Sequence, residues 1–293
     1  MVPEPARTRA LGLIPEHILA HVPGFTRAGT AWALRLPGGT VNASYRVDTN
    51  AGRFVVRIHD PAAATLGADH EREARLHAAA AAAGLAPALI HIDDAYRFMV
   101  MEHIAGPTWS AADFARPERL GQLAAALHVL HSVPAPAVAP FDIEASIGRL
   151  CERLRAALPA EAGQLDALMD RAREALRASQ TARRAKTVVH NDLHHTNLMG
   201  TDRLFLLDWE YGGVTDPLLD LACVLAYYPQ VGAHVDALLE SSQLAEVATP
   251  EMLGAATWLC VFVSYLWYRT RRQAGPVSAA DLATEQGLLT RLG

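Results

Sequence analysis

The chain has 293 residues, of which 51% are apolar and 19% charged, and its formal net charge is −5. This composition is typical of a globular protein with a large core, and it argues against nucleic acid as a partner, which would require a clustered basic excess. The three cysteines, Cys151, Cys223 and Cys260, lie far apart in apolar surroundings and predict free thiols in a cytoplasmic protein. The N-terminal residues lack the apolar stretch of a signal peptide. These features leave the oligomeric state open.

The first hundred residues predict a small α+β unit. Strands are indicated by alternating or β-branched apolar residues, and a helix by an alanine-rich stretch that stops at Gly84. In chain order, the predicted elements are a short helix over 15–22, strands over 40–48 and 53–59, a helix over 69–83, and strands over 89–92 and 97–101. We expect this unit to span residues 1–102.

The rest of the chain, residues 103–293, has a mainly helical pattern. Its predicted elements are helices over 120–131, 141–158 and 161–178, short apolar runs at 188–189 and 204–207, and helices from there to the end. The stretch from Met252 to Tyr268 is 17 residues without a charge, shorter than the roughly 20 needed to cross a membrane. A buried helix is therefore expected there, and no membrane span.

Two polar segments beside the short apolar runs predict phosphoryl transfer. Asp192 follows His190 by two residues, Asn197 follows Asp192 by five, and Asp208 follows Asn197 by eleven. Kinases use the order H-x-D-x-x-x-x-N with a later Asp to place a catalytic base and two magnesium ligands. Asp192 is predicted to accept the proton of the acceptor hydroxyl, and Asn197 and Asp208 to bind Mg²⁺.

The cluster of His190, His194 and His195 raises the alternative of a zinc site. Zinc would need further ligands, and no Cys or Glu lies at partner spacing. His190 is therefore expected to support the catalytic loop through its ring nitrogens.

ATP is expected to bind the first unit. Gly38 and Gly39 form a turn that leads into Asn42 and a strand, where backbone N–H groups could cover phosphates. Arg57 lies in an apolar run, where a charge is costly unless paired. We predict that Glu73 is its counter-charge and that its guanidinium binds phosphates, the alternative being that Arg57 points into solvent.

The strand that ends at Met101 would connect the two parts of the chain. Its last residues and those that follow would present backbone groups to the adenine ring. Met101, Glu102 and Ile104 are the predicted residues.

The chain resembles the aminoglycoside phosphotransferase and choline kinase superfamily, from Gly38 to about Ala274. The residues that carry the resemblance are His190-Asn-Asp-Leu with Asn197, Leu207-Asp-Trp-Glu-Tyr211, Asp216-Pro-Leu-Leu-Asp220 and Phe54-Val-Val-Arg57. The resemblance implies an α+β, bilobal, protein-kinase-like fold, with a small β-rich N-lobe (1–102) that binds the nucleotide and a mainly helical C-lobe (103–293) with the catalytic loop. The second and fourth segments are closest to bacterial choline, ethanolamine and thiamine kinases.

The resemblance also implies a reaction, the Mg²⁺-dependent transfer of the ATP γ-phosphate to a small, cationic alcohol. Glu210, Tyr211 and Trp267 would bind this substrate, because aromatic faces attract ammonium groups. Asp216 and Asp220 would be structural supports, with Asp220 supporting the catalytic loop. For the aromatic residues of the late helix, packing in the core is the alternative role; these are Trp258, Tyr265, Trp267 and Tyr268.

Two other functions are weighed against this one. An aminoglycoside phosphotransferase would need several carboxylates around its polycationic substrate. The late segments offer Glu240, Glu246, Glu251 and Asp281 for this purpose. The second alternative, a non-catalytic nucleotide-binding scaffold, is disfavoured because the base and both predicted magnesium ligands are intact.

Overall fold

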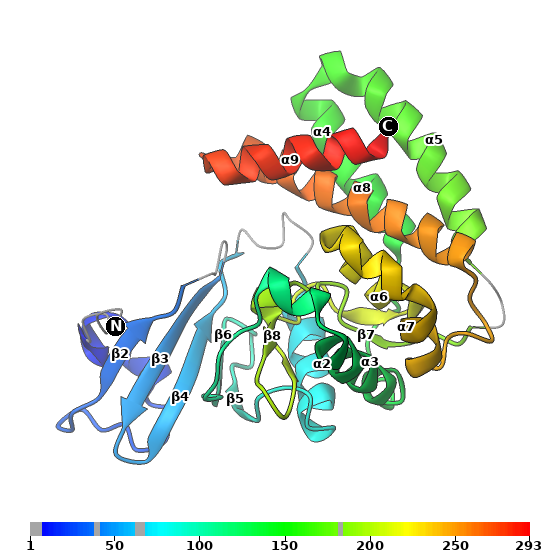
Figure 1. Ribbon diagram of the computed structural model, residues 1–293. Helices are drawn as coiled ribbons and strands as arrows, with labels where there is room; N and C mark the ends of the chain where they lie inside the picture. Colours follow the sequence, from blue (N-terminus) through cyan, green and yellow to red (C-terminus); the bar gives the residue numbers. More distant parts are fainter. Residues whose placement is uncertain (1–7, 38–41, 62–67, 181–183) are drawn as a thin grey trace.

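An antiparallel six-stranded sheet dominates the N-terminal part of the computed structural model, which describes residues 8–37, 42–61, 68–180 and 184–293 (Figure 1). The strands lie in the order β1-β2-β3-β4-β6-β5. Their bounds are Thr8–Arg9 for β1, Trp32–Arg35 for β2, Ala43–Thr49 for β3, Gly52–Ile58 for β4, Leu89–Ile92 for β5 and Phe98–Glu102 for β6. The segment between β1 and β2 contains the 3-10 turn η1 (Ala10–Gly12) and the short helix α1 (Glu16–Leu19).

The two faces of this sheet have different neighbours because side chains alternate along each strand. Val47 and Val56 belong to a core that the sheet shares with η1 and α1. Met99 belongs to a second cluster, on the side of helix α2 (His70–Ala82). Arg57 lies opposite Met99 in the β4–β6 pair and forms an ion pair with Glu73 of α2. Its charge therefore lies on the α2 side of the sheet, inside the molecule.

Helix α2 begins and ends at the expected signals. The side chain of Asp69 accepts a hydrogen bond from the backbone N–H of Arg72 at 3.0 Å, as an N-cap does. Gly84 follows the helix with a φ of 76°, in the left-handed region that glycine tolerates best. With both ends fixed, the helix holds Glu73 and Leu76 buried against the rest of the protein.

The described residues of the C-terminal part form mainly helices, with four short strands. The helices are α3 (Pro117–His131), α4 (Ile143–Ala157), α5 (Ala162–Ser179), α6 (Leu218–Tyr227), α7 (Val235–Ser241), α8 (Pro250–Ala274) and α9 (Ala279–Leu292). The strands are β7 (Thr187–Val189), β8 (Leu198–Met199), β9 (Phe205–Leu206) and β10 (Gly213–Thr215). The 3-10 turns are η3 (Ala111–Ala115), η4 (Pro159–Glu161), η5 (His195–Asn197) and η6 (Pro229–His234).

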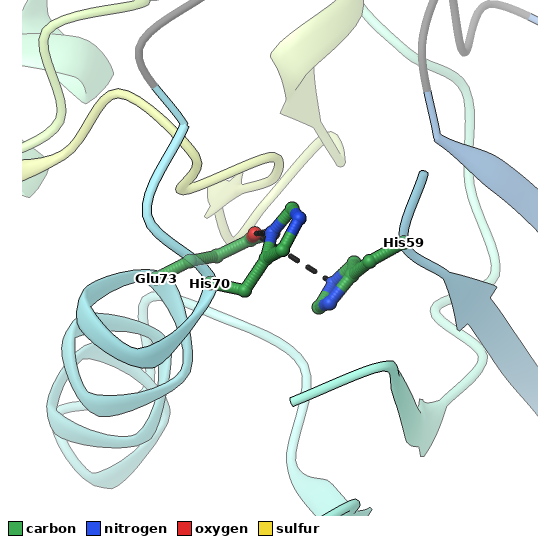
Figure 2. Close-up of side chains that lie close together, drawn as sticks. All are labelled: His59, His70 and Glu73. Carbon is green, nitrogen blue, oxygen red and sulfur yellow. Dashed lines mark hydrogen bonds and ion pairs between the residues drawn. The ribbon is translucent and has the colours of Figure 1, made fainter. Parts of the chain in front are cut away.

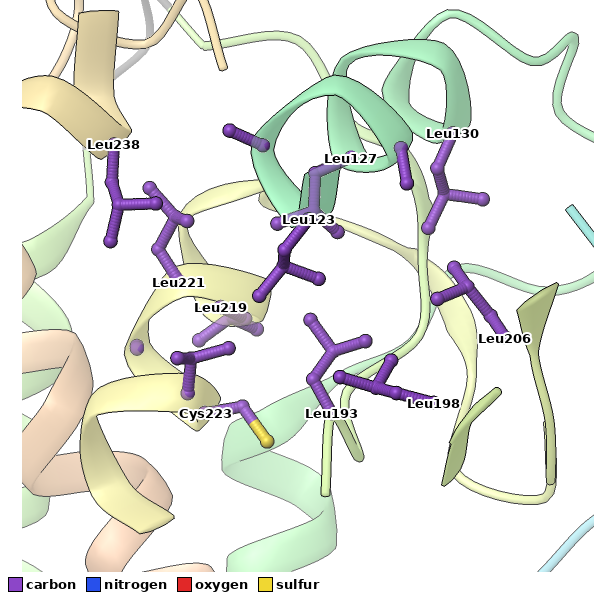
Figure 3. Packing of buried hydrophobic residues seen from close by; sticks show 14 of the residues in the cluster. Leu123, Leu127, Leu130, Leu193, Leu198, Leu206, Leu219, Leu221, Cys223 and Leu238 are labelled. Atoms are coloured by element: carbon purple, nitrogen blue, oxygen red, sulfur yellow. The ribbon is translucent and has the colours of Figure 1, made fainter. Parts of the chain in front are cut away.

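Two hydrophobic cores hold these helices. In the first, Leu123 and Leu127 of α3 pack with Leu193, Leu198 and other residues of the β7–β9 region (Figure 3). The second lies around α8, which packs against α4, α5, α6 and α9. The first core therefore contains Leu193 and Leu198, which lie within the polar motif, and the second core joins α8 to the helices around it.

The predicted buried helix over 252–268 is confirmed as part of α8. Leu259, Phe262 and Leu266 of this helix are fully buried. In the described part of the chain, no helix has the length and apolar character required to cross a membrane. The three cysteines are free, as predicted.

The predicted fold class is confirmed, since an N-terminal antiparallel sheet precedes a mainly helical part. The sheet is larger than predicted because β1 and β2 were missed. Both are short, and Ala33 is the one buried residue of β2, so neither has a clear alternating pattern. Helix α1 is shorter than the predicted 15–22. The division of the chain at 102 and 103 stays a prediction.

We expect Gly213→Ala to lower the free energy of unfolding by about 1–3 kcal/mol, the usual cost of overpacking. A Cβ at this position in β10 would overlap the Cβ of Phe141 and lie 3.0 Å from its Cγ. Thermal or urea unfolding measures the effect. Gly254→Ala in α8 is the control, because a Cβ there meets no atom within 4 Å, and alanine should stabilise the helix by up to about 1 kcal/mol. Equal stability of Gly213→Ala and the wild type would contradict this packing.

Candidate active site

Two small strand pairs bring the polar motif together. Strand β7 pairs with β10 and β8 pairs with β9, so the loop after β7 lies beside the residues that follow β9. The backbone N–H of Leu207 donates to the carbonyl of Asn197 at 2.8 Å. Asp192, Asn197 and Asp208 consequently line one cavity of about 770 Å³.

Most of the predicted site residues line this same cavity. They are Asn42, Arg57, Glu73, Met101, Glu102, Ile104, Asp192, Asn197, Asp208, Glu210, Tyr211 and Trp267. His190, Asp216 and Asp220 are not among the lining residues. Gly38 and Gly39 lie outside the described residues. The structure therefore brings together side chains that are up to 225 positions apart, from Asn42 to Trp267.

The carboxylate of Asp192 is held by one hydrogen bond on each oxygen. The side-chain amide of Asn197 donates to Oδ2 at 2.9 Å, and the hydroxyl of Tyr227 donates to Oδ1 at 2.9 Å. Burial, and then the negative charge of Asp208, raise the pKa of Asp192 to about 7, although the two hydrogen bonds act in the opposite direction. Tyr227 lies on α6 and was not predicted, because it is 35 residues from Asp192 and no motif spacing links the two.

Asp220 and His190 fix the backbone of the catalytic loop. One oxygen of Asp220 accepts the N–H groups of His190 and Asn191 at 2.9 and 2.8 Å, and its other oxygen contacts Nε2 of His131 at 2.9 Å. Nε2 of His190 lies 2.9 Å from the carbonyl of Leu207, and Nδ1 lies 3.3 Å from the N–H of Asp192. Both ring nitrogens of His190 are thus used within the protein.

These contacts hold a loop whose backbone is unusual. Asn191 has a φ of 61°, a left-handed conformation that a non-glycine residue adopts only when its surroundings enforce it. Asp220 and His190 are both fully buried, and burial lowers the pKa of His190, which keeps the ring neutral. A neutral ring with one N–H donor and one acceptor nitrogen matches the two contacts of His190.

Asp216 has a separate set of contacts. Its carboxylate accepts hydrogen bonds from Nε of Arg184 at 2.9 Å and from Nη2 at 2.8 Å. It also accepts the backbone N–H of Leu218 at 2.9 Å, near the start of α6. Asp216 thus anchors the helix that carries Tyr227 and Asp220, and does not touch the loop itself in these bonds.

A buried guanidinium connects the sheet to the residues after β9. Nε of Arg57 lies 3.3 Å from Oε1 of Glu73, while Nη2 lies 2.5 Å from Oδ1 of Asp208 and 3.2 Å from Oε2 of Glu210. The alternative that Arg57 points into solvent is wrong, since only 8% of the residue is exposed. Among the described residues, Nη1 has no hydrogen-bond partner, so this nitrogen is left for a ligand.

Asn42 joins the same network from the beginning of β3. Its side-chain amide donates to Oε2 of Glu210 at 2.7 Å, and its oxygen accepts the N–H of Asp60 at 3.0 Å. Burial, and then the charge of Asp208, raise the pKa of Glu210. Residues that were predicted for ATP and for the acceptor are thus bonded to one another.

Glu73 also contacts two histidines (Figure 2). Its Oε2 lies 3.3 Å from Nδ1 of His70 and 3.6 Å from Nε2 of His59. Burial alone would raise the pKa of Glu73, but Arg57 and the histidines lower it to about 2. The two imidazole rings stack at 4.0 Å with an angle of 11° between them. Since ring lone pairs lie in the ring planes, these nitrogens do not converge on one ion, and the cluster is not a metal site.

Aromatic residues also line the cavity. Nε1 of Trp267 donates to the hydroxyl of Tyr211 at 2.7 Å, and the ring of Trp267 packs edge-on against Tyr268. Of the four late-helix aromatics, Trp267 and Tyr268 line the cavity, whereas Tyr265 is buried in the second core and Trp258 packs against it. The helix therefore divides its aromatic residues between the cavity and the core.

Comparison with known proteins identifies a family for the chain. Residues 32–253 match the model of the phosphotransferase enzyme family. The chain belongs to this family. A choline/ethanolamine kinase family protein from Mesorhizobium loti has 25% identity and a TM-score of 0.73, over 97% of this chain and 91% of that one. The choline kinase LicA from Streptococcus pneumoniae has 17% identity and a TM-score of 0.78, over 96% of this chain and 98% of that one.

A curated relative matches a shorter segment. Protein LicA of Haemophilus influenzae is 45% identical over 53 residues, which are 18% of this chain and 20% of that protein. The matched segment thus spans about a fifth of that relative. Other similar structures include aminoglycoside phosphotransferases and complexes with AMP, ADP or ATP. These likenesses support the predicted kinase-like fold, an N-terminal sheet followed by a mainly helical part.

We expect Asp192→Asn to stabilise the ligand-free protein above pH 7. Between about pH 4 and 7 the unfolded chain loses a proton that folded Asp192 still binds, so the wild type loses stability as the pH rises through this window. At pH 8 the variant should be more stable by on the order of 1–4 kcal/mol, at about 1.4 kcal/mol for each unit of pKa difference. Urea unfolding in EDTA at several pH values measures this.

Asp202→Asn, at an exposed position, is the control for the loss of one charge. The stability difference between Asp192→Asn and the wild type should grow between pH 4 and 7. A constant difference would contradict a buried Asp192 with a raised pKa.

Proposed function

We propose that the enzyme transfers the γ-phosphate of ATP to the hydroxyl of a small cationic alcohol, with Mg²⁺ as cofactor. One observation carries the proposal. The carboxylate of Asp192, held by Asn197 and Tyr227, lines the same cavity as the Arg57–Asp208 pair and as the aromatic residues Tyr211 and Trp267. A base, a phosphate-binding end and an acceptor-binding end are thus arranged within one space.

In the proposed reaction, Asp192 orients the acceptor hydroxyl and accepts its proton. The oxygen forms a bond to the γ-phosphorus while the bond from that phosphorus to the bridging oxygen of ADP breaks, so that ADP leaves. A base with a pKa near 7 is well matched to this proton transfer at neutral pH. Tyr227 and Asn197 keep the carboxylate in one orientation, which is the main requirement in a reaction controlled by positioning.

The residues at this end of the cavity fit a magnesium ion. Mg²⁺ prefers oxygen ligands and is usually bound by one or two carboxylates together with substrate phosphates. Asp208 offers a carboxylate whose side chain is 30% exposed to the cavity, and Asn197 uses its amide nitrogen on Asp192, which leaves its oxygen available. When bound, the ion would neutralise phosphate charge.

Nucleotide binding is assigned to the sheet side of the cavity. Val55 and Met99 of β4 and β6 line it, together with Met101, Glu102 and Ile104 at the end of β6 and beyond. Apolar strand residues suit a flat base, and the residues after the strand can offer backbone groups to its edge. Nη1 of Arg57 is placed to meet phosphate, since the other nitrogens of this guanidinium already face carboxylates.

The acceptor end favours a small ammonium group over an aminoglycoside. Aromatic faces attract ammonium groups, and Tyr211, Trp267 and Tyr268 line this end. The carboxylates considered for an aminoglycoside are absent from the described lining of the cavity; they are Glu240, Glu246, Glu251 and Asp281. Asp281 is instead paired with Arg271 at 2.8 Å.

A coupled assay of ADP release tests the proposed activity on choline, ethanolamine, thiamine and an aminoglycoside, with ATP and Mg²⁺. We expect turnover of at least one small amino-alcohol, and a fall in kcat by about 10²–10⁴ in Asp192→Ala, the usual contribution of a general base. Thermal unfolding checks that the variant is folded. Failure of every alcohol, or preferential turnover of the aminoglycoside, would contradict the proposal.

Trp267→Leu should raise the KM of a cationic alcohol about 3–30-fold, from the loss of a cation–π contact of about 0.5–2 kcal/mol. The KM of ATP should stay within about 2-fold of the wild type, because Trp267 lies at the acceptor end. Trp258→Leu, on the same helix but outside the cavity lining, is the matched control. An unchanged KM for the alcohol in Trp267→Leu would remove this residue from the acceptor site.

A further inference from the structure

One side of helix α4 faces the cavity. The lining residues recur every three or four positions, as expected for one face of a helix, and they are Ile143, Ser146, Arg149, Leu150 and Arg153. Leu150 belongs to the core around α8, so this face stands next to the helix that carries Trp267. Two arginines therefore lie on the helical wall of the cavity, on the side of the proposed acceptor.

Among the described residues, these arginines are the only charged side chains on that helical wall of the cavity. Helices α6 and α8 contribute other residues to the lining, and in the described part of the chain none of these is charged: Leu219, Cys223, Ala226, Tyr227, Cys260, Val263, Ser264, Trp267 and Tyr268. A site for a simple cation would be expected to have carboxylates here, or no charge at all. Arg149 and Arg153 instead bring positively charged groups to this wall.

The guanidinium of Arg149 is oriented by a neighbouring side chain and has no described carboxylate partner. Its Nη2 donates to Oγ of Ser146 at 2.9 Å, which orients the guanidinium, and no described carboxylate pairs with it. Arg155, on another side of the same helix, does have such a partner in Asp166. An oriented guanidinium without a carboxylate partner, at the edge of a cavity, is the group that proteins use for carboxylate or phosphate oxygens.

A third guanidinium lies near Arg149. Arg72 of α2 lies over the ring of Phe141, at 5.7 Å from its centroid. Burial, and then the positive charge of Arg149, lower the pKa of Arg72, while Asp69 acts in the opposite direction. Asp69 lies 3.7 Å from this guanidinium, and Arg149 adds a further positive charge near it.

We propose that the acceptor alcohol carries an anionic oxygen group as well as its ammonium group, and that Arg149 and Arg153 bind it. The proposal rests on the proposed function and narrows it to a zwitterionic alcohol. In this arrangement the aromatic residues Tyr211 and Trp267 hold the ammonium group, Asp192 faces the hydroxyl, and the arginines of α4 hold the anion. The nucleotide is assigned to the sheet side, where Arg57 offers its own phosphate-binding nitrogen.

The test compares alcohols in pairs that differ only by the anionic group. L-carnitine is compared with β-methylcholine, and L-homoserine with 3-amino-1-propanol, so that each pair differs by one carboxylate. Steady-state kcat/KM is measured for the wild type, Arg149→Gln, Arg153→Gln and the double variant. Arg155→Gln, on the same helix but paired with Asp166, is the control.

We expect the wild type to prefer the anionic member of at least one pair by about 10-fold or more. The double variant should lower kcat/KM for that member by about 10–100-fold, as expected for the loss of charged hydrogen bonds, mainly through KM. The KM of ATP and the turnover of the member without the anion should stay within about 2-fold. Arg155→Gln should leave all of these values unchanged.

Other outcomes overturn the inference and identify which part failed. Equal or better turnover of the alcohols without an anion contradicts the zwitterion and leaves the proposed function standing. A raised KM for ATP in the variants assigns the arginines to the nucleotide. If no alcohol is turned over, the proposed function fails as well. Thermal shifts with the same pairs and a nonhydrolysable ATP analogue then show whether the wild type binds the anionic members and the double variant does not.

Discussion

The ion-pair network of Arg57 is the interaction on which the site depends. A single buried guanidinium reaches Glu73 on α2, Asp208 after β9 and Glu210 two residues later. These groups come from three parts of the fold, so their relative positions are set by one another more than by any single element. Breaking a buried network of this kind costs several kcal/mol, because it leaves charges without partners. The position of Asp208, the proposed magnesium ligand, therefore depends on the position of the sheet that carries Arg57.

The loop that carries Asp192 combines a rigidly held backbone with a carboxylate whose charge is unfavourable in its buried position. Asp220 and His190 are fully buried and use their hydrogen-bonding groups to hold the loop backbone. Asp192 follows these supports with a raised pKa, which suits the proposed base but lowers the stability of the folded protein above neutral pH. The first hydrophobic core, with Leu193 and Leu198 inside it, provides the stability that offsets this cost.

The sequence is most informative where function requires residues at short, regular spacing. His190, Asp192 and Asn197 belong to one loop, and Asp69 and Gly84 mark the ends of α2, so local chemistry sufficed to predict them. The position of Arg57 beside Glu73 followed from the cost of a charge in an apolar strand. Tyr227, His131 and Arg149 are different, because they meet the site only through the packing of helices. Short strands such as β2 were missed for a related reason, since pairing with β3 and not their own pattern makes them strands.

The backbone at Asp208 restricts how this enzyme can diverge over generations. Its φ of 65° is left-handed, which Asp, Asn and Gly tolerate and which bulkier residues rarely adopt. Glu at this position would strain the turn and also displace the carboxylate, so the exchange is not conservative. Asn and Gly keep the turn, but neither carries the charge that faces Arg57. Asn and Gly would therefore keep the backbone turn but remove one carboxylate from the buried Arg57 network, so a descendant that lost the proposed magnesium ligand would also lose stability.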